Sequence, residues 1–192
     1  MIFEVLQVIT EEVNSYFEGS PVSLENIATI DSETGDNPNT TPDIVLSLLN
    51  LKEEFTLKNQ PNYHINGTEV TYKNPKLNLN IFILFSGTNT TYTEALKGIS
   101  KVLEFFQGKK VFTQDNTIYN RDEEGMENLT NFKFIVDLYT PSFEEMNFIW
   151  GTLGGKQYPS ALYKVTLLEI ERDLILEKGT VITGLNSGLN NQ

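Results

Sequence analysis

The stretch SFEEMNFIWGTLGGKQYPSALYKV, residues 142–165, joins a predicted helix to a predicted strand through a glycine-rich run. Ser142 and Glu145 have the S-x-x-E spacing of a capping box, which predicts a helix that begins at Phe143. Apolar residues then recur at steps of three and four, as on one face of a helix. The residues of this predicted apolar face are Phe143, Met146, Ile149, Trp150 and Leu153.

The glycine-rich run GTLGGK poses a choice between a phosphate-binding loop and a structural corner. Gly154 and Gly155 fall where a helix needs a left-handed end, and Pro159 prevents the helix from continuing. A phosphate-binding loop has the opposite order, because it follows a strand and opens a helix. It also needs Ser or Thr after the lysine, and this chain has Gln157 there. Residues 161–170 are rich in strand formers, so the run predicts a corner between a helix and a strand.

Composition excludes several classes of protein. The chain has 192 residues, a formal net charge of −12 and 39% hydrophobic residues, which is typical of a folded domain. Such acidity argues against binding to nucleic acid or to an anionic membrane. The absence of cysteine excludes disulfides, thiolate nucleophiles and zinc–cysteine sites. The single histidine, His64, excludes paired-histidine metal sites.

The N-terminal segment MIFEVLQVITEEV lacks a basic region, and glutamates interrupt its apolar run. It therefore predicts neither a signal peptide nor a membrane span, and we expect the chain to be made and folded in the cytoplasm. Its apolar residues share one helical face, which predicts an amphipathic helix over residues 2–18 that Gly19 ends.

Further patterns complete the predicted order of elements. Asn66-Gly67, between two short runs of strand formers, is a strong hairpin signal within the polar stretch 52–76. Thr91 and Glu94 form a second capping box, which predicts a helix that extends to Phe106. Residues 113–128 are expected to form a long acidic loop. Strands are predicted over residues 24–30, 43–51, 77–85, 131–139 and 161–170.

The fold class that follows is α+β, in a single domain. We expect a mostly antiparallel sheet of four or five strands flanked by about three helices. The predicted domain covers residues 1–174, with the hairpin excursion at 52–76 projecting from it and the acidic loop at 113–128. Residues 175–192, rich in Gly and Asn, are expected to form a flexible C-terminal tail.

No group of residues has the pattern of a catalytic or metal site. The segment Asp31–Asp36 resembles a calcium loop, but Gly35 occupies a position that needs an oxygen ligand. His64 lies in the predicted hairpin, where an exposed strand residue is a better interpretation than a catalytic base. We therefore expect no enzyme activity, no cofactor and no metal. A small ligand-binding or catalytic domain that uses His64 remains a distant alternative, and it would require a pocket beside that residue.

Three long stretches resemble a known family. They are IVLSLLNLKEEFTLKNQP (44–61), NPKLNLNIFILFSGTNTTYTEALKGISKVLEFFQGKKVFT (74–113) and LTNFKFIVDLYTPSFEEMNFIWGTLGGKQYPSALYKVTLLEI (129–170). They are similar to the cap, or tail-terminator, proteins of extracellular contractile injection systems. These phage-tail-like particles include antifeeding prophages and Photorhabdus virulence cassettes.

The resemblance implies a structural protein with three partners: further copies of itself in a homohexameric ring, the inner tube protein and the sheath protein. Such a ring lies at the baseplate-distal end, where it ends tube growth and anchors or terminates the sheath. The particle is assembled in the cytoplasm and is extracellular after release. An assembly factor or another ring component of the same particle remains an alternative.

The polar segments outside the predicted core are the candidates for contacts in such a ring. We expect the interface to use the 52–76 excursion, the tail, and lysines that offset the net negative charge of neighbouring copies. The candidate interface residues are Lys52, Glu53, Glu54, Lys58, Tyr63, Tyr72, Lys73, Lys109 and Lys110.

Overall fold

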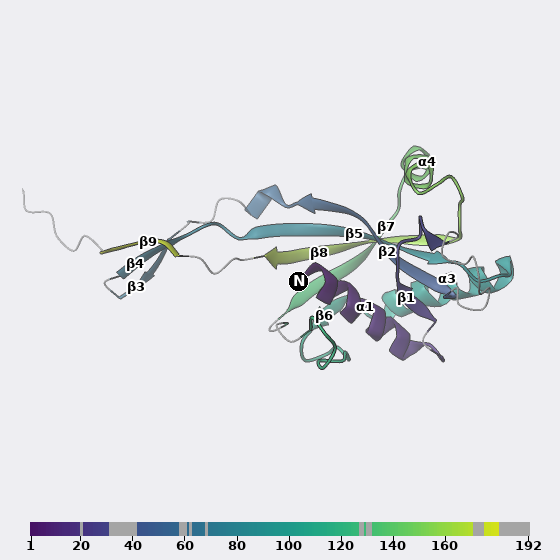
Figure 1. Ribbon diagram of the computed structural model, residues 1–192, viewed down its shortest axis with the longest axis horizontal. Helices are drawn as coiled ribbons and strands as arrows, with labels where there is room; N and C mark the ends of the chain where they lie inside the picture. Colours follow the sequence, from purple (N-terminus) through teal and green to yellow (C-terminus); the bar gives the residue numbers. More distant parts are fainter. Residues whose placement is uncertain are drawn as a thin grey trace, which may run out of the picture. The chain divides into compact units, whose positions relative to one another are not determined.

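In the computed structural model, the chain divides into two compact units, each held together by its own contacts. The first unit contains Met1–Lys52 and Leu79–Leu168, and the second contains Glu53–Asn78 and Glu169–Gln192. The structure describes residues 1–19, 21–30, 42–57, 61, 63–67, 69–126, 129, 132–170 and 175–180. Figure 1 shows the helices and strands of both units, which are described separately below.

A six-stranded sheet is the framework of the first unit, with the strand order β1-β2-β5-β8-β7-β6. β1 pairs with β2 in parallel, whereas β7 pairs antiparallel with both β6 and β8. The α+β class is confirmed, but the sheet is larger than the four or five strands predicted. The strands are β1 (Val22–Leu24), β2 (Ile44–Glu53), β5 (Leu77–Gly87), β6 (Val111–Thr113), β7 (Lys133–Tyr139) and β8 (Ser160–Ile170).

The two edge strands explain the difference in number, because β1 was predicted with other bounds and β6 was not predicted. β1 and β6 have three residues each, which is too short for an alternating pattern to be recognised. The strand expected over residues 24–30 ends at Leu24, and residues 27–29 form a turn.

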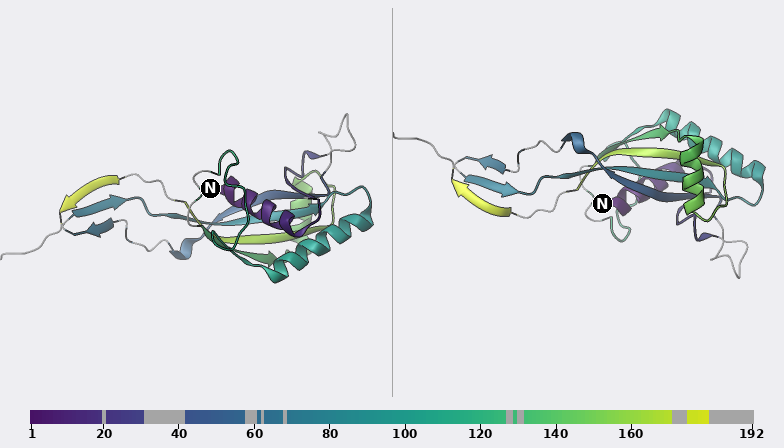
Figure 2. Two further views of the ribbon diagram at one scale, coloured as in Figure 1. Left: turned by 90° about the horizontal axis from the view of Figure 1, so that it is seen from below. Right: turned by 90° about the horizontal axis from the view of Figure 1, so that it is seen from above.

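Two helices cover one face of this sheet and a third covers the other, as the two views of Figure 2 show. α1 (Ile2–Tyr16) and α3 (Tyr92–Gly108) lie together on one side, and α4 (Phe143–Thr152) lies on the opposite side. The three helices predicted from the sequence are confirmed. Thr91 is the N-cap of α3, and its side chain accepts a hydrogen bond from the Glu94 N–H.

The core between the sheet and α1 and α3 is aromatic. Phe106 of α3 lies 4.4 Å from Tyr163 of β8 and 5.5 Å from Phe85 of β5, measured between ring centroids. Phe112 of β6 stacks on Phe134 of β7 at 5.1 Å. Because these five rings come from five elements, this cluster joins α3 to most of the sheet.

α4 ends in the corner that the sequence predicts. Ser142 and Glu145 make both bonds of the capping box. Gly154 and Gly155 have φ angles of +101° and +80°, a region that L side chains rarely adopt. The Gly155 N–H donates to the Trp150 carbonyl at 2.7 Å, which closes the helix end, and β8 follows.

The second unit contains a three-stranded antiparallel sheet in the order β3-β4-β9. β3 (Tyr63–Asn66) and β4 (Glu69–Lys73) form the predicted hairpin, and Gly67 in its turn has a φ of +65°. A short 3-10 helix, η1 (Phe55–Leu57), precedes them. Residues 175–180, which we expected to begin a flexible tail, instead form β9 (Ile175–Thr180). This segment is ordered as a strand because it pairs with the free edge of β4, and an isolated two-stranded hairpin is only marginally stable. Residues 181–192 lie outside the described residues.

Candidate interaction surfaces

The sequence offers two candidates for chemistry, His64 and the acidic segment Asp31–Asp36. Within the described ranges, no group of three or more His, Asp or Glu side chains is placed to hold a metal ion. His64 is exposed on β3 opposite Thr71, as expected for an exposed strand residue. The calcium-like segment Asp31–Asp36 lies outside the described residues. In the described part of the chain, no helix is long and apolar enough to span a bilayer.

The sheet of the second unit has one polar face and one mostly apolar face, on which Glu177 of β9 pairs with Tyr72. Tyr63 pairs with Tyr72 across β3 and β4, with ring centroids 6.3 Å apart, and Ile65 pairs with Val70 on the same face. Tyr63, Tyr72 and Ile65 are exposed. The opposite face carries His64, Thr71 and Lys178. Two of the predicted interface residues, Tyr63 and Tyr72, therefore stand together on an exposed aromatic surface beside Glu177.

The other predicted residues of the excursion lie around its two ends. Lys52 is exposed near the end of β2, and Glu53 and Glu54 follow it in half-buried positions. The Glu54 N–H donates to the Asn78 carbonyl at 2.8 Å. Lys73 is half-buried at the end of β4, at a bulge in its pairing with β9. Lys58 lies outside the described residues.

Lys109 and Lys110 are adjacent in the chain but differ in environment. The Lys109 ammonium forms a salt bridge with Glu12 of α1 and donates to the Asn116 carbonyl. It also lies 5.2 Å from the centroid of the Phe112 ring. These contacts use the charge of Lys109 inside the subunit, whereas Lys110 is exposed.

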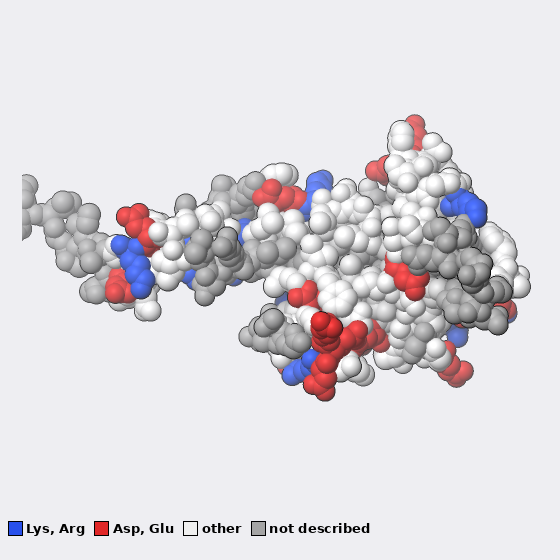
Figure 3. Space-filling model, in the orientation of Figure 1, with Lys and Arg blue, Asp and Glu red and all other residues white. Residues whose placement is uncertain are grey.

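The acidic loop that follows β6 is held against α1. The second carboxylate oxygen of Glu12 accepts the Ile118 N–H at 2.5 Å, and Glu11 accepts the Asn120 N–H. Gln7 donates to Glu123 at 2.9 Å. Figure 3 shows acidic side chains gathered on this part of the surface. The loop is therefore tied to the first helix by side-chain contacts.

An apolar surface on α4 was missed by the sequence analysis. The helix periodicity predicts that Phe143 lies on the buried face, but its side chain is 97% exposed. Phe148, which lies off that predicted face, is 72% exposed, and Trp150 is the fully buried residue of α4. The prediction of a buried Phe143 is wrong because this residue stands in the first turn of a short helix, which does not pack against the sheet there. An aromatic residue outside the periodic stripe, Phe148, was the signal available.

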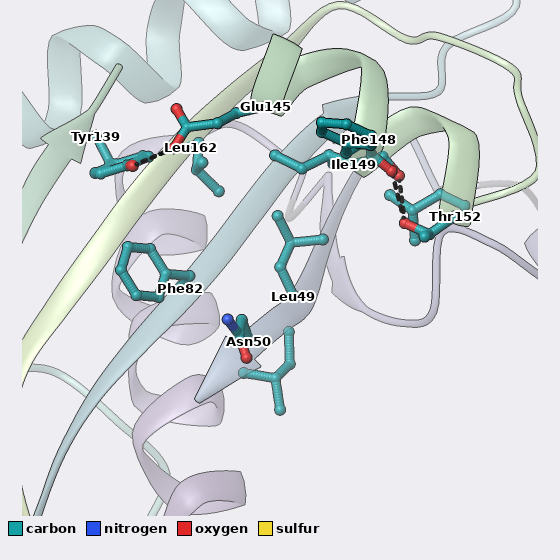
Figure 4. A pocket seen from close by; sticks show the side chains of 11 residues that line it. Leu49, Asn50, Phe82, Tyr139, Glu145, Phe148, Ile149, Thr152 and Leu162 are labelled. Atoms are coloured by element: carbon teal, nitrogen blue, oxygen red, sulfur yellow. Dashed lines mark hydrogen bonds between the residues drawn. The ribbon is translucent and has the colours of Figure 1, made fainter. Parts of the chain in front are cut away.

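A groove lies beside α4 on the same face of the sheet (Figure 4). It has a volume of about 450 Å³, and apolar side chains from α4, β2 and β5 point into it. Tyr139 donates to Glu145 at 3.1 Å at its edge, and this hydrogen bond together with the carboxylate charge raises the pKa of Tyr139. The apolar residues that line the groove are Leu48, Leu49, Phe82, Phe148, Ile149, Leu153 and Leu162.

Comparisons with known proteins give consistent matches. Residues 4–184 match the family model described as the Pvc16 N-terminal domain. The fold is similar to that of a sheath/tube terminator from PVC, an extracellular contractile injection system, with a TM-score of 0.62 and 15% identity. It is also similar to the anti-feeding prophage cap, described as a tube terminating cap, with a TM-score of 0.60 and 16% identity.

The alignments cover nearly all of this chain but a smaller share of each solved chain. The alignments cover 100% and 98% of this chain, but 64% and 62% of the two solved chains. This chain thus spans less than two thirds of the length of each structural relative. No curated protein matches it in sequence.

Proposed function

We propose that this chain, which belongs to the Pvc16 N-terminal domain family, is a structural cap subunit of a contractile injection system. It ends the growth of the inner tube at the baseplate-distal end and anchors or terminates the sheath there. The observation that carries the proposal is that the whole described fold aligns with a protein described as a sheath/tube terminator. The family match from residue 4 to residue 184 supports it independently of the fold, because it rests on the sequence alone.

The proposed working form is a homohexameric ring without enzyme activity. A terminator needs one surface that fits the end of the tube and another that offers no site for a further ring. A ring built by head-to-tail contacts between copies has two different sides. One side can therefore bind the tube while the other binds no further ring. The ring is assembled in the cytoplasm and leaves the cell with the particle, and its further partners are the tube and sheath proteins.

Residues 1–174 supply the body of the cap in this proposal, and the polar excursion supplies contacts with the tube or with neighbouring copies. The apolar face formed by Tyr63 and Tyr72 supports this role, because an exposed aromatic pair is typical of interfaces. The other residues proposed for the interface are Lys52, Glu53, Glu54, Lys58, Lys73, Lys109 and Lys110.

Purified particles test the proposal. Mass spectrometry and electron microscopy of particles made with and without this chain give its position and its effect on tube length. We expect the chain at one end of the particle and tubes of uncontrolled length in its absence. Particles that lack the chain but reach normal length would contradict the cap role and would favour an assembly factor. A position elsewhere in the particle would indicate another ring component.

A further inference from the structure

Two exposed phenylalanines distinguish α4 from the other helices. Phe143 and Phe148 are five positions apart, which places them about 140° apart around the helix. A partner that covers both rings must therefore enclose much of the exposed side of α4, and a small molecule in the groove cannot do so. The run from Met146 to Gly155 contains no charged residue. Glu144 and Glu145 stand between the two phenylalanines in the chain, so the apolar part of the surface lies at Phe148 and beyond it. Exposed aromatic residues of this kind are enriched at the centres of protein–protein interfaces.

The size of this surface agrees with a subunit contact. A buried aromatic side chain contributes about 150–250 Å² of contact area, so the two rings together supply roughly 300 Å² or more. The apolar groove beside them adds the exposed parts of Leu48 and Ile149. A contact of standard size needs about 800 Å² on each partner. The α4 surface, defined here as Phe143, Phe148 and the groove residues, is large enough to be the centre of such a contact.

A second apolar surface lies on the opposite face of the main sheet. Tyr92, Leu96 and Leu103 of α3 are 70%, 44% and 39% exposed, and their spacing places them on one side of the helix. We call these three residues the α3 stripe. The neighbouring positions on that side, Ser100 and Gln107, are neutral, whereas the charged residues of α3 lie on its other exposed side.

From these two surfaces we infer that the α4 surface of one copy packs against the α3 stripe of the next copy in the ring. The inference rests on the proposed function, since it names the contact that would build the ring. The two surfaces lie on opposite faces of the sheet (Figure 2), so each copy offers a different surface to each neighbour. Such a contact is heterologous and can close into a ring. The α3 stripe contains no charged residue, so it does not repel Glu144 and Glu145, which lie one turn before Phe148 on α4.

Substitution of both phenylalanines tests the inference. The full-length variant F143S/F148S should be monomeric at concentrations where the wild type forms rings, as measured by analytical ultracentrifugation and electron microscopy. Loss of two central aromatic residues should weaken each contact by at least about 30-fold. Because both side chains are exposed, the melting temperature should change by less than about 3 °C. The matched control is I118S, which removes an apolar residue of the acidic loop about as exposed as Phe148 and should leave the rings intact.

Cysteine cross-linking tests the pairing of the two surfaces directly, since the chain contains no cysteine. Copies with Phe148→Cys mixed with copies with Leu96→Cys should form disulfide-linked dimers on oxidation, and the double variant F148C/L96C should form covalent chains and rings. Efficient dimers from Phe148→Cys alone would overturn the inference, because they would show that α4 meets α4.

The outcomes separate this inference from the proposed function. Rings that persist in F143S/F148S would overturn the α4 contact and leave the cap proposal standing. If that variant keeps its rings but no longer binds the tube or sheath, the α4 surface belongs to one of those partners and the inference is equally wrong. A wild-type chain that stays monomeric at the end of the tube would contradict the ring and this inference, and would leave its position as a cap standing.

Discussion

The two faces of the main sheet differ in how completely they are covered. α1 and α3, with 15 and 17 residues, bury one face under a cluster of aromatic rings. α4 has 10 residues, buries Trp150 against Val45, Leu84 and Leu162, and leaves a groove beside itself. The same strands therefore supply a folding core on one side and an apolar surface open to a partner on the other. The predictions below test this division of roles, and they begin with the largest expected effect.

Truncation within the aromatic cluster should be the most damaging change. Phe106→Ala removes a ring that contacts Phe85, Phe112 and Tyr163, and it leaves a cavity among them. We expect a loss of about 3–5 kcal/mol in the free energy of unfolding, as for other buried Phe-to-Ala changes, measured by urea denaturation. An exposed aromatic residue of the opposite face, in the variant Phe148→Ala, is the matched control and should change stability by less than about 0.5 kcal/mol. Equal losses in the two variants would show that the faces do not differ.

The contact between α1 and the acidic loop should be the next in size. Glu12→Ala removes an acceptor from Lys109 and from the Ile118 N–H, and all of these groups are at least partly buried. Since hydrogen bonds to charged groups are worth about 1.5–3 kcal/mol, we expect a loss in that range. Hydrogen exchange should also accelerate in residues 114–126. If the loop keeps its protection in the variant, Glu12 does not hold it.

Substitutions of the two helix caps should cause smaller losses of stability, and they compare one helix from each face of the sheet. Ser142→Ala removes the capping box of α4, and Thr91→Ala removes the cap of α3. N-cap substitutions of this kind typically cost about 1 kcal/mol. The bond at Thr91 is longer, 3.4 Å against 3.2 Å at Ser142, and no reciprocal bond accompanies it in the described residues. We therefore expect the larger loss for Ser142→Ala in thermal denaturation, and a larger loss for Thr91→Ala would contradict this ranking.

Local signals in the sequence were sufficient to predict most elements. Both capping boxes and the Asn66-Gly67 turn depend on a few adjacent residues, so they do not require knowledge of tertiary packing. β9 was missed because its pairing with β4 joins residues about a hundred positions apart. The periodicity of α4 places Phe143 on the same side of the helix as the other apolar residues. Periodicity does not show which turns of a helix lie over the sheet, so it did not predict that Phe143 is exposed. The sign in the sequence of the exposed α4 surface, which carries the inferred ring contact, was Phe148, an aromatic residue outside the predicted stripe.

The smallest effect should have the opposite sign, and it concerns the one polar atom at the centre of the aromatic cluster. The Tyr163 hydroxyl is buried, and no hydrogen-bond partner for it is present among the described residues. Tyr163→Phe removes the cost of burying that group while keeping the ring, so we expect a gain of up to about 1 kcal/mol in the free energy of unfolding at neutral pH.

Burial also raises the pKa of Tyr163 above its usual value. Because the folded state then holds the proton more tightly than the unfolded state, the wild type should lose stability as the pH rises above about 10, the ordinary tyrosine pKa. The variant lacks this loss, so the difference between the two proteins should widen above that pH in urea titrations. A difference that stays constant up to pH 11 would show that the hydroxyl is hydrogen-bonded or solvated in the folded protein, and that this face of the sheet is less closed than its aromatic packing indicates.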